Sequence, residues 1–279
     1  MTKENTQRVF IPGSKWVYYK VYCGLNTADN ILTQMIGPLG NQLIKDGIID
    51  RWFFIRYSDP ENHLRIRFLL KDKEKIETVM RGVYQALESQ VSNKLIWDLQ
   101  LATYQRELER YGSNTIDDLE SFFHSDSKFL LEIIKNSQDE ETRFQQVFHY
   151  VNSIVNLFIS NLEEKLAFLD TGQSSFKTEF NANNFTKKQL SKKYRSFNNG
   201  DYSGALQIDL QPLQAIADKL LNLDKEGALE LPLDNLLGSI VHMTVNRAFQ
   251  SRQRLYEMVL YDFLYQKTRS DYYRQKKGK

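Results

Sequence analysis

The stretch WFFIRYSDPENHLRIRFLL, residues 52–70, decides the fold of this protein. Aromatic and β-branched residues on either side of the polar segment SDPEN are typical of two strands joined by a turn, in which Pro60 fixes one φ angle. Because successive side chains of a strand point to opposite faces, the second strand has one apolar face and one basic face. The apolar face carries Leu64, Ile66 and Phe68, and the basic face carries His63, Arg65 and Arg67. Arginine is rarely buried without a partner, so this basic face requires an explanation.

Outward from this hairpin, the first hundred residues alternate between strand and helix patterns. The segment KWVYYKVYCG, residues 15–24, is aromatic and β-branched and ends at Gly24, as strands do. Residues 28–45 and 73–88 place apolar side chains at helical spacing, and KLIWDLQLATY, residues 94–104, predicts a fourth strand. The order β-α-β-β-α-β predicts a ferredoxin-like sheet unit over residues 10–104.

Beyond Tyr104 the apolar spacing is helical almost throughout. Residues 115–136 and 140–169 predict two helices, and Pro232 predicts the first turn of a long final helix that runs to about residue 267. The polar stretches 172–185 and 197–204 are rich in loop residues and predict mobile loops or linkers. We therefore expect an α+β fold in a single domain, residues 1–279, whose mainly helical part, residues 105–279, packs on the sheet unit.

Composition narrows the class of protein. A chain of 279 residues with 41% hydrophobic residues can bury a sizeable core. The net charge of +2 is nearly balanced, so it gives no general electrostatic reason to bind nucleic acid or a membrane surface. Cys23 is the only cysteine, which excludes a disulfide within the chain and a thiolate zinc cluster. The sequence contains no signal peptide and no apolar run that could span a membrane, so we expect a cytoplasmic protein that needs no metal or cofactor.

Two further clusters of polar side chains accompany the basic face of the hairpin. The segment YQRELERYG, residues 104–112, follows the fourth strand and places Glu107 and Arg110 three residues apart, a spacing that also suits a surface ion pair. The segment SIVHMTVNR, residues 239–247, places His242 and Asn246 on one face of an apolar helix, where a histidine is often only a satisfied core residue. Each cluster alone is compatible with a structural role.

Taken together in this order, residues 52–68, YQRELERYG and SIVHMTVNR resemble the C-terminal elimination domain of class I lantibiotic dehydratases, also called the thiopeptide-type bacteriocin biosynthesis domain. The resemblance covers most of the chain, and DPENHLRIRF is its most specific motif. It implies elimination of glutamate from glutamylated serine or threonine in a ribosomal precursor peptide, which leaves dehydroalanine or dehydrobutyrine. Full dehydratases carry a glutamylation domain that uses glutamyl-tRNA ahead of this one. The resemblance therefore implies the small subunit of a split dehydratase, with a separate glutamylation subunit as partner, and it is compatible with a homodimer.

The resemblance also assigns site residues by their positions in the motifs. The predicted catalytic residues are His242, Arg67, Arg110 and Glu107. The predicted substrate-binding residues are Arg65, Arg56, His63, Asn246 and Arg247. The chemistry fits these residue types, because the glutamyl ester keeps a free γ-carboxylate and the planar guanidinium of arginine binds carboxylates through two hydrogen bonds. His242 is expected to move the proton, and Glu107 either orients an arginine or serves as a base.

Other functions stay open at this point. Thiopeptide pyridine synthases share the domain and join two dehydroalanines into a six-membered ring, but they generally lack the full set of arginines and histidine. A non-catalytic member would hold a leader peptide as an added strand or helix. We interpret the basic runs KKQLSKKYR, residues 187–195, and RQKKGK, residues 274–279, as a solvated helix face and a frayed terminus, because neither is interleaved with a stacking platform of aromatic side chains. If the three motifs form one site, they must converge on one cleft.

Overall fold

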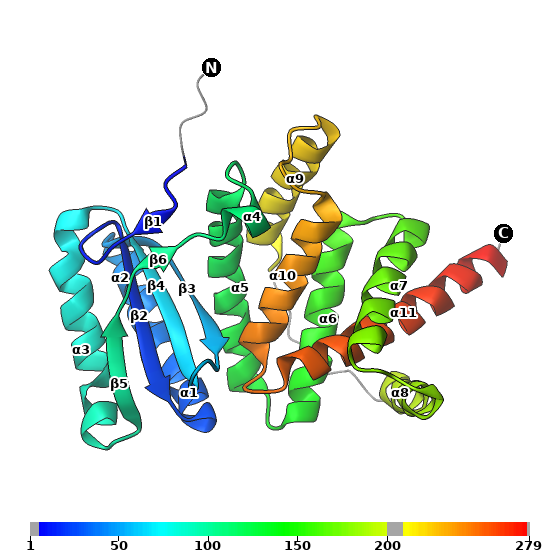
Figure 1. Ribbon diagram of the computed structural model, residues 1–279, viewed down its shortest axis with the longest axis horizontal. Helices are drawn as coiled ribbons and strands as arrows, with labels where there is room; N and C mark the ends of the chain where they lie inside the picture. The colour runs from blue at the N-terminus through cyan, green and yellow to red at the C-terminus, as the bar shows by residue number, and fades with distance from the viewer. Residues whose placement is uncertain (1–5, 200–208, 278–279) are drawn as a thin grey trace.

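The computed structural model describes residues 6–199 and 209–277, which form a sheet-containing N-terminal half and a helical C-terminal half (Figure 1). The main sheet is antiparallel and has the strand order β3-β4-β2-β5. Its strands are β2 (Trp16–Cys23), β3 (Ile49–Tyr57), β4 (His63–Leu70) and β5 (Ile96–Leu101). The β2–β3 connection holds α1 (Leu25–Asn30), the π-helical turn η1 (Ile31–Ile36) and α2 (Gly37–Lys45). The β4–β5 connection holds η2 (Lys73–Lys75) and α3 (Ile76–Ser92), so the predicted order of strands and helices is present.

A second, two-stranded sheet lies between the two halves. Residues 94–104 do not form one strand, as the sequence predicted, because pairing in the main sheet stops at Leu101. The chain then forms β6 (Tyr104–Gln105), which pairs antiparallel with β1 (Val9–Phe10). This change of partner leads the chain away from the sheet and toward the helices.

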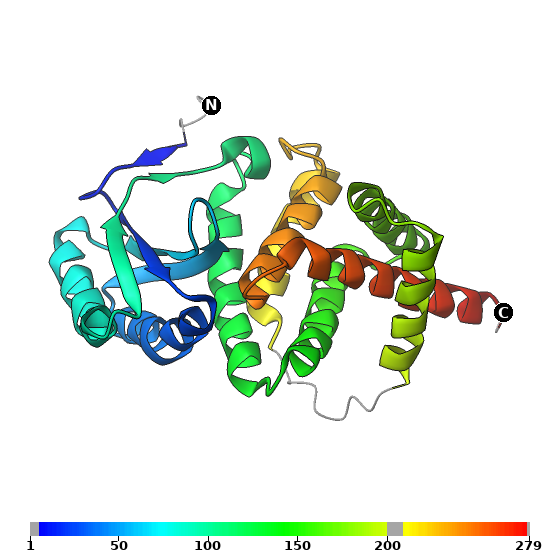
Figure 2. The same ribbon diagram turned by 60° about the horizontal axis from the view of Figure 1, so that its bottom comes forward.

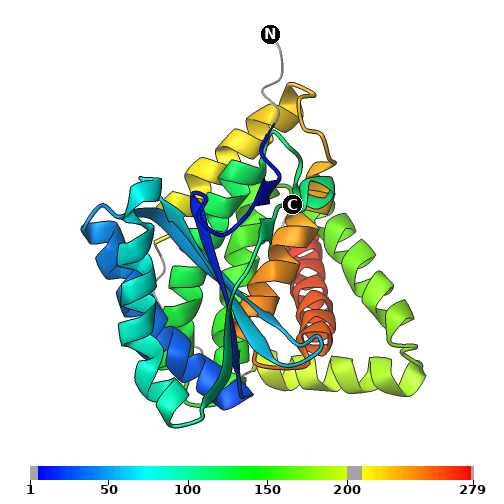
Figure 3. The ribbon, with the colours of Figure 1, turned by 60° about the vertical axis from the view of Figure 1, so that its left-hand side comes forward.

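The main sheet lies between its own connecting helices on one side and the helical half on the other (Figure 3). A hydrophobic core fills each of the two interfaces. The apolar face of β4, with Leu64, Ile66 and Phe68, packs against α1, η1, α2 and α3. The opposite face, which includes Tyr18 and Phe53, belongs to the core that the helical half shares. The basic face of the hairpin is therefore turned toward the helices.

Two helices of the helical half, α5 and α10, pack against β3, and the others lie farther from the main sheet (Figures 1 and 2). Helix α5 packs on β3 along the core, and α10 meets both β3 and α5. None of the helices in the described ranges combines the length and the apolar character needed to cross a membrane. The helices are α4 (Leu108–Tyr111), α5 (Ile116–Asn136), α6 (Glu140–Phe158), α7 (Leu162–Glu179), α8 (Asn184–Asn198), α9 (Gln211–Lys225), α10 (Leu233–Ala248) and α11 (Gln253–Lys277).

The predictions for residues 140–185 were wrong in two respects. The single helix over residues 140–169 is two helices, because Asn161 begins α7 by accepting hydrogen bonds from the backbone N–H groups of Glu163 and Glu164. The predicted loop at residues 172–185 is helical up to Glu179 and again from Asn184. Phe176 is buried, and its packing stabilises the helix although most of this stretch is polar. Of the predicted loop at residues 197–204, Phe197 and Asn198 end α8, and residues 200–204 lie outside the described ranges.

The long final helix is also two helices. Pro232 precedes α10 as its N-cap, and α10 ends at Ala248. Residues 249–252 then turn the chain into α11, and Arg252 adopts a positive φ of 54° at this turn. The turn brings α11 back beside α10 and α7, which matters for the site described below.

Gly172 permits the close approach of α7 to α11. A Cβ at this position would lie 2.4 Å from Cδ1 of the buried Tyr261 ring on α11. We expect Gly172→Ala to lower the free energy of unfolding by about 1–3 kcal/mol, as overpacking does. Gly238→Ala on α10 is the matched control, because no atom lies within 4 Å of its added Cβ and alanine favours helix by roughly 1 kcal/mol. Denaturant titration of both variants checks the opposite signs, and equal stabilities would contradict the close packing.

Candidate active site

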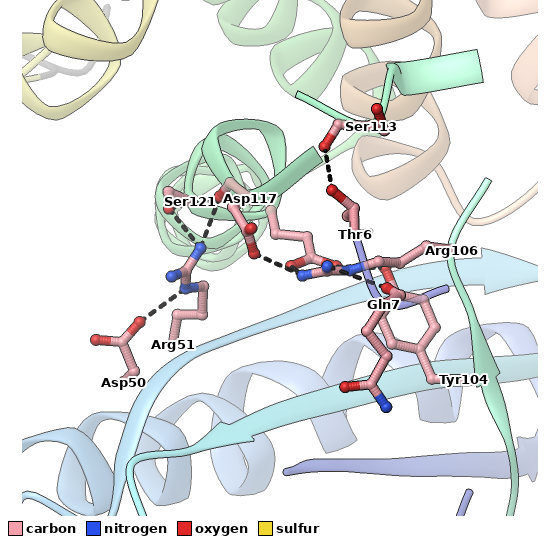
Figure 4. Close-up of polar contacts among 10 residues, drawn as sticks. Thr6, Gln7, Asp50, Arg51, Tyr104, Arg106, Ser113, Asp117 and Ser121 are labelled. Carbon is pink, nitrogen blue, oxygen red and sulfur yellow. Dashed lines mark hydrogen bonds and ion pairs between the residues drawn. The ribbon is translucent and has the colours of Figure 1, made fainter. Parts of the chain in front are cut away.

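The second motif is anchored by a buried arginine. Arg106 donates from Nε to Glu120 Oε1 at 2.8 Å and from Nη2 to Glu120 Oε2 and Asp117 Oδ1, both at 2.6 Å (Figure 4). Tyr104 adds a hydrogen bond from its hydroxyl to Glu120. These contacts tie β6 to α5 and fix the position of the turn α4 that follows.

Helix α4 and its N-cap residue Glu107 present the predicted catalytic residues of the second motif. Arg110 Nη1 lies 3.6 Å from Glu107 Oε2, and Arg110 Nε donates to Ser239 Oγ on α10 at 3.3 Å. Glu107 is largely exposed, whereas Arg110 is partly covered. The second motif therefore contacts the third motif through Ser239, a residue that the sequence analysis did not select.

His242 lies one helical turn after Ser239 on the same face of α10. Its Nδ1 is 2.9 Å from Oε2 of Glu257 on α11, and its side chain is 28% exposed. Among the described residues, none bonds its Nε2. His242 therefore has one fixed ring nitrogen and one that is open to a ligand.

Arg110, Ser239 and His242 line a groove of about 1320 Å³ between α4, α7, α10 and α11. Phe168 and Phe176 of α7 form part of its apolar wall. The groove is large enough for several residues of an extended peptide. It combines a cationic group, a hydroxyl and an imidazole on one wall with apolar side chains on the other.

Arg67, from the basic face of β4, is buried without an anionic partner. It is 7% exposed, and its guanidinium carbon lies 4.5 Å from the ring centroid of Tyr18 and 4.6 Å from that of Tyr104. Arg67 donates no hydrogen bond to any described residue and forms no ion pair with one, and its Nε is buried without an acceptor. Aromatic faces attract a cation, but they do not replace the hydrogen-bond acceptors that the guanidinium has lost. Arg67 is therefore suited to bind an anionic ligand.

Arg65 lies two residues before Arg67 on the same face of β4. Its Nε donates to Nε2 of His63 at 3.1 Å, and its guanidinium carbon lies 3.4 Å from the ring centroid of Tyr57. His63 Nδ1 is 2.8 Å from the carbonyl oxygen of Glu61, so the two contacts together fit a neutral imidazole. Burial lowers the pKa of His63, which agrees with that state.

Lys20 extends this basic face on the neighbouring strand β2. It lies directly opposite Arg65 in the sheet, where like charges are unfavourable. The sequence analysis did not select Lys20. The alternation of Tyr18, Lys20 and Tyr22 in residues 15–24 is the signal that could have found it, because it repeats the polar face of β4.

Tyr111 is the buried last residue of α4. It follows Arg110 in the chain, and burial raises the pKa of its hydroxyl to about 12, against the opposing charges of Arg110 and Arg67. Arg65 and Arg67 are, however, not among the described residues that line the groove. The second and third motifs share one groove, whereas the arginines of the first motif lie on β4, outside the residues that line this groove.

The other predicted binding residues join α10 to the sheet. The Asn246 amide exchanges two hydrogen bonds of 2.9 Å with the backbone of Arg56, while Arg247 donates to the Phe54 carbonyl oxygen and pairs with Asp126. The Arg56 side chain pairs with Asp29 at 2.5 Å. Together with His63, Arg56 and Asn246 line a separate cavity of about 290 Å³. Because most of these donors already serve the fold, a role in substrate binding stays a prediction for Arg56, Asn246 and Arg247.

The family model described as "Lantibiotic biosynthesis dehydratase C-term" matches residues 16–268, from the first residue of β2 into α11. This chain belongs to that family. All three motifs lie within the residues that this family model matches.

Relatives of this lantibiotic dehydratase domain include much longer proteins. The subtilin biosynthesis protein SpaB of Bacillus subtilis is 26% identical over 270 residues, which cover 91% of this chain and 26% of SpaB. The nisin biosynthesis protein NisB of Lactococcus lactis subsp. lactis is 25% identical over 246 residues, which cover 86% of this chain and 24% of NisB. The chain thus spans about a quarter of the length of the curated relatives that it matches.

Two solved structures share the fold of the lantibiotic dehydratase domain. The tRNA-dependent lantibiotic dehydratase MibB from Microbispora sp. 107891 aligns with a TM-score of 0.73 and 20% identity, over 95% of this chain and 29% of MibB. TbtD, a pyridine synthase from thiomuracin biosynthesis, aligns with a TM-score of 0.62 and 11% identity, over 92% of this chain and 98% of TbtD. At these identities the likeness concerns the fold.

Proposed function

We propose that this domain eliminates glutamate from glutamylated serine or threonine residues of a ribosomal precursor peptide and leaves dehydroalanine or dehydrobutyrine. The observation that carries the proposal is Arg67, a buried guanidinium with no anionic partner among the described residues. The substrate ester offers the missing partner, because its glutamyl group keeps a free γ-carboxylate. A guanidinium binds that carboxylate through two parallel hydrogen bonds.

The groove supplies the groups for the chemical step. His242 takes the α-proton of the modified residue on Nε2, the Cβ–O bond breaks, and glutamate leaves with the electron pair as its α-carboxylate. Arg110 stabilises the enolate oxygen that develops when the α-proton leaves, an effect commonly worth about 3–4 kcal/mol for a well-placed donor. Glu107, 3.6 Å from Arg110 and largely exposed, orients that guanidinium.

The remaining details of the fold and its partners belong to the same proposal. We infer that the sheet unit is ferredoxin-like, because its four antiparallel strands follow the order β3-β4-β2-β5 with helices in the β2–β3 and β4–β5 connections. The glutamylated precursor peptide is the proposed partner. A separate glutamylation subunit, a single domain over the whole chain, a homodimer and a cytoplasmic location stay predictions.

The test is mass spectrometry of a synthetic peptide that carries a glutamyl ester on one serine, incubated with the protein. We expect loss of glutamate together with formation of a dehydro residue, which a thiol adduct then verifies. His242→Ala is expected to slow the reaction by about 10²–10⁴-fold, the usual contribution of a general base. Return of the free serine would mean ester hydrolysis and would contradict the proposal.

The fold shared with TbtD keeps a cycloaddition as the competing function. A second peptide with two dehydroalanines, incubated under the same conditions, separates the two activities. We expect this peptide to stay linear. Formation of a six-membered ring with release of the leader would contradict elimination as the proposed function and would support pyridine synthesis instead.

A further inference from the structure

We propose that Glu257 is a positioning residue that sets the tautomer and orientation of His242, and that Arg254 and Glu179 hold Glu257 in place. The inference rests on the acid–base role proposed for His242. It adds three residues outside the motifs to the functional unit, none of which the sequence pattern selected.

The burial of Glu257 is the first observation. Its side chain is only 3% exposed, although it lies beside a large open groove. A carboxylate buried to this extent is stable only if charged or polar groups satisfy it. Its Oε2 has two such partners, His242 Nδ1 at 2.9 Å and Arg254 Nη1 at 3.1 Å.

The support of Arg254 is the second observation. Its Nε donates to Glu179 Oε1 at 3.1 Å, and its Nη2 contacts Glu179 Oε2, so the two side chains form a bidentate pair. The guanidinium carbon also lies 4.5 Å from the ring centroid of Phe176. Glu179 and Phe176 belong to α7, Arg254 and Glu257 to α11, and His242 to α10. Three helices therefore meet in one chain of charged contacts that ends at the imidazole.

This arrangement determines which ring nitrogen of His242 can act as a base. A carboxylate accepts a hydrogen bond, so the neutral imidazole carries its proton on Nδ1. The lone pair is then on Nε2, which has no described partner and belongs to a side chain that lines the groove. Glu257 also stabilises the imidazolium that forms after proton transfer, as the carboxylate does in histidine–carboxylate pairs of other enzymes.

The first test measures the tautomer and requires no substrate. The protein contains four histidines, so a ¹⁵N–¹H spectrum of the imidazoles resolves few signals, and His242→Ala identifies the one of interest. At a pH where the imidazole is neutral, we expect the wild type to carry the proton on Nδ1. Glu257→Gln is expected to give a mixture of tautomers, because its amide both donates and accepts. A wild-type spectrum with the proton on Nε2 would overturn the inference, whatever the variants do.

The second test measures elimination from the glutamylated peptide. We expect Glu257→Gln to lower kcat by about 10- to 100-fold with KM unchanged, as loss of a group that orients a functional histidine does. Glu257→Asp, which keeps the charge, is expected to retain more activity than Glu257→Gln. Asp262→Asn is the matched control: this buried carboxylate lies on the same helix, pairs with Lys177 at 2.5 Å and does not touch His242.

The outcomes separate this inference from the proposed function. A wild-type protein that does not eliminate glutamate contradicts the proposed function, and the spectrum still decides the role of Glu257. Elimination by the wild type with unchanged kcat in Glu257→Gln contradicts the positioning role alone. An equal loss of activity in Asp262→Asn would assign the effect to a weakened α11 and would also overturn the inference.

Discussion

Arg67→Met is expected to lower kcat/KM for elimination by at least about 10²-fold, because both charge-assisted hydrogen bonds to the γ-carboxylate of the substrate are lost, without lowering the thermal midpoint. The reason is the absence of a described partner: no ion pair or hydrogen bond is lost, and no buried carboxylate is left behind. Methionine fills a similar volume between Tyr18 and Tyr104 and needs no acceptor. A residue kept for ligand binding is expected to contribute to function without stabilising the fold, and Arg67 makes no polar contact that would stabilise it.

Elimination rates with the glutamylated peptide and thermal unfolding of the purified variant check this expectation. Arg67→Lys is the conservative comparison, and we expect it to restore only part of the rate, because a lysine ammonium cannot form the bidentate contact with a carboxylate. A methionine variant that unfolds much earlier than the parent would assign Arg67 to the core. A variant with the parental rate would remove it from the site.

The periodicity of the sequence predicted the N-terminal half well, and it could not predict how deeply its basic face is covered. Alternation in β4 places Arg67 on the face opposite Leu64, as observed, because that pattern depends only on neighbours in the chain. The burial of Arg67 depends on Tyr104 and other residues that reach it from another part of the chain. A solvated arginine and a buried one have the same spacing.

In the helical half, too, the sequence could not predict structure that depends on contacts between distant residues. Residues 172–179 have a polar sequence and read as a loop, but the contact between Gly172 and Tyr261 and the burial of Phe176 keep them helical. Glu257 was not among the predicted site residues for a related reason. It lies 15 positions after His242, beyond a turn that the sequence did not predict, and only the return of α11 brings the two side chains together.

Residue type alone cannot distinguish an arginine that is buried in the fold from one that lines the groove, as the two arginines of the second motif show. Arg106 and Arg110 are four residues apart, which on a helix would place them on one face. In the structure Arg106 belongs to the segment before α4 and is buried against Glu120, while Arg110 lies on α4 and lines the groove. The motif thus contains one arginine that is buried in the fold and one that lines the groove.

Arg106→Met is expected to lower the stability of the protein strongly, in contrast to Arg67→Met, although both arginines are buried beside aromatic rings. Glu120 has no exposed side-chain surface, and Arg106 satisfies both of its oxygens (Figure 4). Removal of the guanidinium leaves a buried carboxylate with only the Tyr104 hydroxyl, and we expect the free energy of unfolding to fall by about 3–5 kcal/mol. Urea denaturation of both variants under identical conditions measures the contrast.

The double variant Arg106→Met/Glu120→Gln identifies the cause of that loss. If the unpaired charge dominates, the neutral amide restores a large part of the stability, and the coupling free energy of the cycle is well above the few tenths of a kcal/mol seen for independent sites. Asp117 is left without Arg106 in both variants, but its side chain is 65% exposed and water replaces the contact. Additive losses in the cycle would mean that packing of the arginine side chain against Phe10, rather than its charge, holds the second motif in place.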